Sequence, residues 1–327
     1  MDLDYFALER LQLNFSQAGY IALNTVLAIV MFVVALGVDP HDFKKVLLKP
    51  KASLVGLIAQ ILLFPAFSFL LVKILQPAPS IGLGMILVAC CPSGNVANFL
   101  CSVAKGNVPL SVCMTTFSTL LAIITTPFNF AIWSRLYTEA SGITHTISLD
   151  AWTIISNILW FFCLPLVLGM VFAKLLPRLK EKIIKPAKKI SMVLFIGFLL
   201  MALLSNVKSF IEFIPYIFIM VLIQNGIGFL TGFSVSYIFR LSKEDRRSVS
   251  LYTGILNSGL GLSLIFNPET FNGNGGMAFI AAWWGIWHII PGLGIALVCL
   301  RRVKRSLLLE VEKQTETVSL QPSLSIE

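Results

Sequence analysis

The sequence is short of charge, and above all it lacks acidic residues where a membrane would surround them. Only 13% of its 327 residues are Asp, Glu, Lys or Arg, against roughly 25% in an ordinary soluble domain. Hydrophobic residues make up 57% of the chain, and the sixteen acidic residues all lie in connecting segments, termini or the ends of apolar runs. These proportions exclude a soluble globular domain and indicate a polytopic membrane protein.

Residues that bind metals or form disulfides are few and scattered. The chain has three histidines and six cysteines, and every cysteine lies in an apolar run, where it behaves as a small hydrophobic side chain. A zinc site needs Cys and His ligands at short spacings, which are absent here. We therefore expect no disulfide, metal centre or bound cofactor, with Na+ left open as a coupling ion. The acidic first 17 residues also lack the basic start of a cleaved signal peptide.

Nine apolar runs are long enough to cross a bilayer core about 30 Å thick, which takes roughly 20 residues of helix. They cover about 19–38, 52–75, 81–104, 108–133, 151–172, 190–207, 213–239, 248–266 and 277–300. Of the 25 Lys and Arg residues, all but Arg10, Lys73, Arg135 and Lys208 then fall on one side of the membrane. The positive-inside rule makes that side the cytoplasm, so the N-terminus is predicted outside and the C-terminus inside. The net charge of +9 is thus a topology signal and does not indicate a nucleic-acid partner.

Two of these runs are interrupted by residues that break helices. Residues 90–100 read Cys-Cys-Pro-Ser-Gly-Asn-Val-Ala-Asn-Phe-Leu, and residues 253–263 contain three glycines together with Asn257 and Ser258. With an odd number of spans the two runs point in opposite directions, as in inverted-repeat transporters whose broken helices meet at the substrate site. Each break offers a half-helix N-terminus, which suits an anion, and free carbonyls, which suit a cation. The sequence therefore predicts an anion and cation site at the crossing.

Uncharged polar side chains inside the spans are the candidate site residues. Asn95, Asn98 and Asn257 lie beside the helix breaks, and a buried amide needs partners, so we predict functional roles for them. Serine and threonine often bond to their own helix, so structural roles stay open for much of the remaining set. That set includes Gln60, Ser111, Thr115, Thr116, Ser118, Thr119, Asn225, Tyr252, Ser258 and His288. His288 fits either a hydrogen-bonded residue of the bundle or a proton carrier.

At these residues the chain resembles the bile acid:sodium symporter family, whose members carry bile acids in animals and small organic acids in bacteria and plastids. The similarity extends from about residue 28 to residue 300 and rests on five motifs in a fixed order. They are Cys-Cys-Pro-Ser-Gly-Asn-Val-Ala-Asn at 90–98, Lys-Gly-Asn-Val-Pro-Leu-Ser-Val at 105–112, Thr-Thr-Phe-Ser-Thr at 115–119, Gln-Asn-Gly-Ile-Gly at 224–228 and Asn-Ser-Gly-Leu at 257–260.

The resemblance implies an all-α fold of nine transmembrane helices, with inverted repeats, two broken crossover helices, and separate core and panel domains. Residues 52–136 and 213–300 would form the core spans, and residues 19–39 and 150–207 the panel spans. Residues 1–18 would be an extracytoplasmic N-terminus. Residues 301–327 would be a cytoplasmic tail, and the polar composition from residue 306 onward predicts a mobile extension there.

The resemblance also implies two sodium sites and a substrate site. The first sodium site matches Asn98, Ser111 and Thr115, with Ala97 in place of the family's serine. The second matches Gln60, but a family glutamine is Leu256 here, and the glutamate shared by both sites is Tyr252. Without that carboxylate no formal negative charge offsets a buried sodium ion, so sodium-coupled and sodium-independent transport both stay open. The substrate site would use Asn95 and Asn257, together with the neighbouring Asn98 and Ser258.

We therefore predict a secondary transporter, not an enzyme, that carries a bile-acid-like or small organic anion by alternating access. Its partners would be this anion and the lipid bilayer, with the bacterial inner membrane as its location; its oligomeric state is left open. One alternative is proton-coupled transport through His288 or Tyr252. Another is a membrane sensor of the same fold that binds its ligand without transporting it. A third is an intramembrane serine hydrolase with Ser258 as nucleophile and His288 as base.

Overall fold

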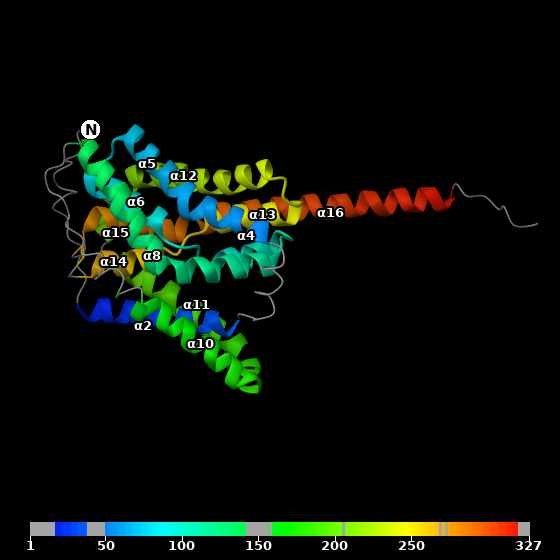
Figure 1. The fold of residues 1–327 in the computed structure, drawn as a ribbon, viewed down its shortest axis with the longest axis horizontal. Helices are drawn as coiled ribbons and strands as arrows, with labels where there is room; N and C mark the ends of the chain where they lie inside the picture. The colour runs from blue at the N-terminus through cyan, green and yellow to red at the C-terminus, as the bar shows by residue number, and fades with distance from the viewer. Residues whose placement is uncertain are drawn as a thin grey trace, which may run out of the picture.

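The computed structural model describes residues 17–37, 50–141, 156, 159–204, 207–267, 270–271 and 274–319, which are almost entirely helical. Most helices lie side by side along the long axis of the molecule (Figure 1). The elements in chain order are α2 (Gln17–Leu36), α4 (Pro50–Ile58), the π-helical turn η1 (Ala59–Leu63), α5 (Phe64–Leu75), α6 (Pro79–Cys90), α7 (Val96–Val103), α8 (Val108–Ser141), the π-helical turn η2 (Leu159–Cys163), α10 (Leu164–Leu175), α11 (Pro177–Leu204), α12 (Val207–Ile238), α13 (Lys243–Gly254), α14 (Ser258–Phe266), α15 (Gly275–Trp287) and α16 (Ile289–Ser319).

Five continuous helical stretches among the described residues are long and apolar enough to cross a membrane. They are Gln17–Leu36, Pro50–Leu75, Val108–Glu139, Ile211–Ile238 and Gly275–Glu310. Two shorter apolar stretches, Pro79–Cys90 and Leu159–Leu175, accompany them. The chain is therefore a helical integral membrane protein, as its composition predicts.

Both predicted helix breaks are confirmed. The apolar run at 81–104 divides into α6 and α7, and the run at 248–266 divides into α13 and α14. Cys91 at the end of α6 is extended, with φ −72° and ψ 149°, because the proline that follows disfavours helical backbone before it. Ile255 at the end of α13 is extended in the same way.

Two polar segments outside the predicted spans are helical where the structure describes them. The basic stretch at 174–189, expected as a connection, is helical except at Leu176, where α10 ends just before α11. The tail, expected as a mobile extension, continues α16 as far as Ser319 and projects beyond the other helices in Figure 1. Both segments are rich in Lys, Arg, Glu and Leu, which are good helix formers, so their polarity indicates exposure and not loss of helix.

Some predictions lie outside the described residues. These concern most of the N-terminal segment 1–18, the connection at 38–49, the start of the fifth apolar run at 151–155 and 157–158, and the end of the tail at 320–327.

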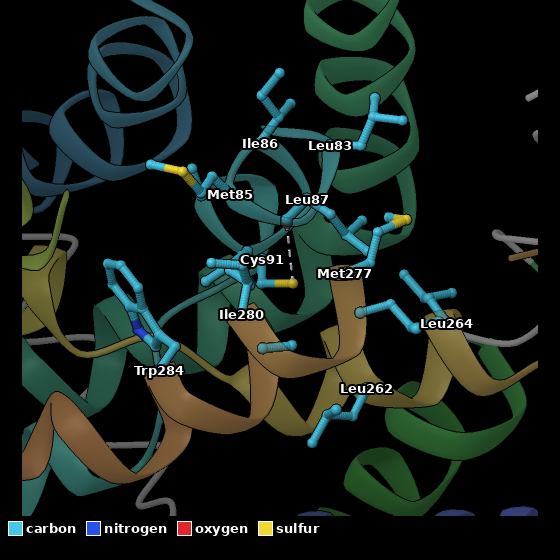
Figure 2. Packing of buried hydrophobic residues seen from close by; sticks show 14 of the residues in the cluster. Leu83, Met85, Ile86, Leu87, Cys91, Leu262, Leu264, Met277, Ile280 and Trp284 are labelled. Carbon is cyan, nitrogen blue, oxygen red and sulfur yellow. Dashed lines mark hydrogen bonds between the residues drawn. The ribbon is translucent and has the colours of Figure 1, made fainter. Parts of the chain in front are cut away.

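The centre of the molecule is built from α6, α14 and α15. Every residue of α6 from Ser80 to Cys90 is buried, as expected for a helix that is apolar on all sides. Figure 2 shows side chains of these three helices packed together, among them Leu87, Leu262 and Ile280. A Cβ on Gly84 would lie only 2.8 Å from the Met277 Cα, so this glycine permits the close approach of α6 and α15. The break after α6 is thereby held at the middle of the protein.

A second group of helices consists of α2, α10 and α11. Gly169 of α10 lies so close to α2 that a Cβ there would be 2.5 Å from the Phe32 carbonyl oxygen. The rings of Phe32 and Phe172 pack edge to face with centroids 5.6 Å apart. One buried polar contact joins this group to α14, where Ser263 Oγ donates a hydrogen bond to Asn24 Oδ1.

Candidate functional site

The two helix breaks meet in a short antiparallel bridge between Ser93 and Leu256. Gly94 N donates to the Ile255 oxygen at 2.8 Å, and Asn257 N donates to the Pro92 oxygen at 2.8 Å. A Cβ on Gly94 would lie 2.8 Å from the Leu256 oxygen, so a glycine is needed at this position. The two broken segments therefore cross in main-chain contact. The four half-helices α6, α7, α13 and α14 all begin or end at this crossing.

Side chains from other helices bond the carbonyls that the first break frees. Thr126 of α8 donates its Oγ1 to the Cys90 oxygen at 2.9 Å. Gln60, in the π-helical turn η1, donates its Nε2 to the Cys91 oxygen at 2.7 Å. Because backbone groups inside a membrane cannot find water, these bonds stabilise a break that would otherwise cost several kcal/mol.

The second break is held in the same manner. Asn225 of α12 donates its Nδ2 to the Gly254 oxygen at 2.7 Å. The Ser93 hydroxyl lies within hydrogen-bond distance of two acceptors, the oxygens of Tyr252 at 2.8 Å and Ile255 at 2.9 Å. Ser93 thus bonds across the crossing to the end of α13, while Asn225 bonds to it from outside.

The helix N-termini at the crossing carry two of the predicted asparagines. Asn257 precedes α14, and its Oδ1 accepts a hydrogen bond from Leu260 N at 3.3 Å. Asn95 precedes α7 without capping it, and its Oδ1 is buried with no hydrogen-bond partner among the described residues. Ser258, the first residue of α14, is buried. Two positive helix ends and their asparagines therefore converge where an anionic group would be favoured.

Asn98, Ser111 and Thr115 are brought together beside the crossing. The Asn98 Oδ1 accepts hydrogen bonds from Ser111 Oγ at 2.7 Å and from Thr115 Oγ1 at 3.2 Å. The two hydroxyl side chains are buried, and Asn98 is half-buried. Two hydroxyl oxygens thus lie within hydrogen-bond reach of one amide oxygen, and a hard cation such as Na+ uses oxygens of this kind as ligands.

Gln60 and Tyr252 are also brought together, but they bond to each other. The Tyr252 hydroxyl donates to Gln60 Oε1 at 3.2 Å, while the Gln60 Nε2 donates to the Cys91 oxygen. Tyr252 is completely buried and Gln60 nearly so. Leu256 contributes its backbone to the bridge with Ser93 and has no side-chain oxygen to offer. This pair carries no formal negative charge that would offset the charge of a second cation.

His288 lies between α15 and α16 and is buried, with 4% of its surface exposed. Its Nδ1 is buried and has no hydrogen-bond partner in the described part of the chain. A serine nucleophile and its base lie within hydrogen-bond reach of each other. The His288 Nδ1 makes no such bond to Ser258, so this nitrogen gives no support to the serine hydrolase alternative.

The sequence reasoning missed Ser93 and Thr126 as residues of the crossing. Ser93 stands within the motif at 90–98, directly between Pro92 and Gly94, and that position was its only signal. Thr126 lies within α8 and has no local signal, because its partner Cys90 is 36 residues away in the sequence.

Known proteins with similar sequences place this crossing in context. The model of the family described as "Sodium Bile acid symporter family" matches residues 24–213. The "Uncharacterized sodium-dependent transporter YocS" of Bacillus subtilis is 29% identical over 282 residues, which are 85% of this chain and 83% of that protein. The "Hepatic sodium/bile acid cotransporter" of Rattus norvegicus is 28% identical over 296 residues, which are 86% of this chain and 79% of that protein.

A third relative is similar over a shorter part of its length. The "P3 protein" of Mus musculus is 28% identical over 228 residues, so the match covers 70% of this chain but only 47% of that protein. The family model alone covers more than half of the chain, over the spans that carry the first helix break and the Asn98 cluster. The chain belongs to the sodium bile acid symporter family.

Proposed function

We propose that this protein is a secondary transporter that moves an organic anion, either bile-acid-like or a small carboxylate, across a membrane. The observation that carries this proposal is the bridge between Ser93 and Leu256, which brings the N-termini of α7 and α14 to one point. Asn95 and Asn257 stand at those N-termini. Their amide N–H groups and the positive helix ends would bind the anion's carboxylate.

The helix grouping supports transport by alternating access. We assign nine spans, counting α6 with α7 and α13 with α14 as one broken span each, in inverted repeats. The panel would consist of α2, α10 and α11, which pack together, and the core would contain the crossing. The N-terminus would lie outside and the C-terminus in the cytoplasm of a bacterial cell. The protein would then act as a carrier and not as an enzyme.

At most one sodium ion would accompany the anion. Asn98, Ser111 and Thr115 would bind it through oxygens that already lie together, and the charge of the anion would offset that of the ion. A second ion is disfavoured, because Gln60, Tyr252 and Leu256 offer no carboxylate to offset its charge. Two relatives are named as a sodium-dependent transporter and a sodium/bile acid cotransporter, which supports coupling to sodium.

Uptake by proteoliposomes tests the anion site. Asn95→Leu and Asn257→Leu each remove an amide from the crossing, and we expect both to lose at least about 90% of uptake of a small carboxylate or a conjugated bile acid. The matched control is Thr25→Leu, since Thr25 bonds only within its own helix and faces outward. Wild-type uptake by both asparagine variants would refute the site. Retained binding without any uptake in the unchanged protein would identify a sensor instead of a carrier.

Binding measured in sodium and in choline at matched ionic strength tests the ion. We expect tighter anion binding in sodium, with one ion bound per anion. Equal binding in both salts would refute the cation role of Asn98 and leave sodium-independent carriage.

A further inference from the structure

The turn that joins α7 to α8 is held against α13 by side chains far along the chain. Arg247 donates its Nη1 to two carbonyl oxygens of this turn, those of Ala104 at 3.2 Å and Lys105 at 2.6 Å. Lys105 has a left-handed backbone, with φ 54°, so the chain reverses sharply at that point. The end of α7 is capped locally, because Gly106 N donates to the Cys101 oxygen at 2.9 Å and Lys105 N donates to the Ser102 oxygen at 3.3 Å, as in a Schellman motif. Arg247 adds bonds to the two carbonyls of Ala104 and Lys105 that follow the helix.

Asn107 links the same turn to α13 through three further bonds. Its Nδ2 donates to Asp245 Oδ1 at 2.8 Å, and its backbone N–H donates to the Glu244 oxygen at 3.4 Å. The Ser248 hydroxyl lies 3.1 Å from the Asn107 oxygen and can donate to it. Meanwhile the Asn107 Oδ1 accepts from Leu110 N and so caps the start of α8. We call the contacts of Glu244, Asp245, Arg247 and Ser248 with residues 104–107 the clasp.

The clasp leaves no spare room around the turn. A Cβ on Gly106 would lie 2.8 Å from both the Cys101 Sγ and the Ser248 Oγ. Cys101 and Ser248 are themselves 3.1 Å apart and buried. The turn therefore packs closely against α13, and a side chain at residue 106 would push the two apart.

This position matters because the turn separates the two halves of the Asn98 cluster. Asn98 stands on α7, before the turn, while Ser111 and Thr115 stand on α8, after it. The bonds from both hydroxyls to Asn98 Oδ1 require α7 and α8 to keep one register. The bridge at Ser93 holds the far end of α7, and the clasp holds its near end.

We infer that Arg247 is a positioning residue for the candidate cation site, fixing Asn98 against Ser111 and Thr115 through the clasp. The cation part of this inference rests on the proposed function. Arg247 itself does not touch the three oxygens. Its guanidinium suits the task, since one planar group carries several fixed donors and can bond two carbonyls at once.

The neighbouring arginine supplies a matched control. Arg246 donates its Nε to the Leu241 oxygen at 3.0 Å and lies over the Tyr237 ring, 5.2 Å from its centroid. Both contacts lie at the end of α12 and in the connection to α13. Arg246→Gln removes the same charge as Arg247→Gln, one residue away, and spares the clasp.

Hydrogen exchange of the purified protein tests whether Arg247 fixes the turn. In Arg247→Gln we expect amides of residues 96–107 to exchange about tenfold faster than in the unchanged protein, since two bonds from a charged donor are lost. Arg246→Gln should change the same amides by less than about twofold. Arg247→Lys should fall between them, because lysine keeps a charged donor but carries it on a flexible stem without the fixed plane of the guanidinium. Equal exchange in Arg247→Gln and Arg246→Gln would overturn the inference.

Uptake as a function of sodium concentration tests whether the fixed turn serves the cation site. In Arg247→Gln we expect the sodium concentration for half-maximal uptake to rise by about three- to tenfold. The anion concentration for half-maximal uptake, at saturating sodium, should change by less than about twofold. Faster exchange with unchanged sodium dependence would overturn the positioning role. Sodium-indifferent uptake by the unchanged protein would refute the cation part of the proposed function, and the exchange comparison would still decide whether the clasp fixes Asn98.

Discussion

Gly94→Ala is the sharpest single perturbation of the crossing. The added methyl group would meet backbone atoms, lying 2.8 Å from the Leu256 oxygen and 3.1 Å from the Leu256 carbon. Backbone cannot rotate away as a flexible side chain can, so the two backbone segments must separate by about 0.6 Å to restore an ordinary contact of 3.4 Å. The substitution therefore acts on the main-chain bridge itself.

The size of the effect follows from the bonds that this separation strains. The bonds from Gly94 to Ile255 and from Asn257 to Pro92 are both 2.8 Å, and an added 0.6 Å would move them past the usual limit of about 3.2 Å. Each bond contributes about 0.5–1.5 kcal/mol, and overpacking costs about 1–3 kcal/mol more. We expect Gly94→Ala to lower the free energy of unfolding by about 2–6 kcal/mol and to abolish most uptake.

Unfolding by SDS titration in mixed micelles measures this loss, and proteoliposome uptake measures the function. The controls are Gly226→Ala and Gly294→Ala, where a Cβ meets no heavy atom within 4 Å. They should change the free energy of unfolding by no more than about 1 kcal/mol, and in the stabilising direction, because alanine favours helix over glycine. A Gly94→Ala protein as stable as these controls would refute main-chain contact at the crossing.

Three further predictions concern the side chains around the crossing. Tyr252→Phe leaves the buried Gln60 Oε1 without its donor and should lower the free energy of unfolding by about 1–3 kcal/mol in the same titration. Tyr237→Phe, at an exposed position, should leave that free energy unchanged. Equal stability of the two variants would show that the Tyr252 hydroxyl has no bond to lose. Asn225→Leu strands the Gly254 oxygen and should cost a similar amount, and an unchanged stability would contradict its role at the second break. Ser111→Ala removes one oxygen from the Asn98 cluster and should raise the sodium concentration for half-maximal uptake at least about threefold, a result checked against Thr25→Val; identical curves would place the ion elsewhere.

Local sequence was sufficient to predict where the chain enters helices of membrane type and where two of them break. The run at 81–104 is apolar but contains Pro92 and Gly94, and each of these acts on its immediate neighbours, so the end of α6 could be placed within a residue or two. The same reasoning does not show that the basic stretch at 174–189 and the first part of the tail are helical. Their polarity places them outside the apolar runs, but lysine, arginine and glutamate sustain a helix equally well in water.

The candidate site shows the same division at the level of single residues. Asn95, Asn98 and Asn257 were recognisable because a buried amide next to a helix breaker is costly wherever the chain goes. The hydrogen bond between Tyr252 and Gln60 could not be predicted, because the resemblance places both residues in one ion site. The two residues are 192 positions apart, and no feature of the sequence near either one indicates that they bond to each other.

What the sequence by itself determined is the membrane environment, the position of the two breaks and the polar residues beside them, because hydropathy and backbone restriction act over a few neighbouring residues. Only the tertiary structure decided that Ser93 bonds to the carbonyls of Tyr252 and Ile255, and that Arg247 bonds to those of Ala104 and Lys105. These partners are more than 140 residues apart in the chain. Their meeting depends on how whole helices pack, and on glycines such as Gly94 and Gly106 that let two backbones touch.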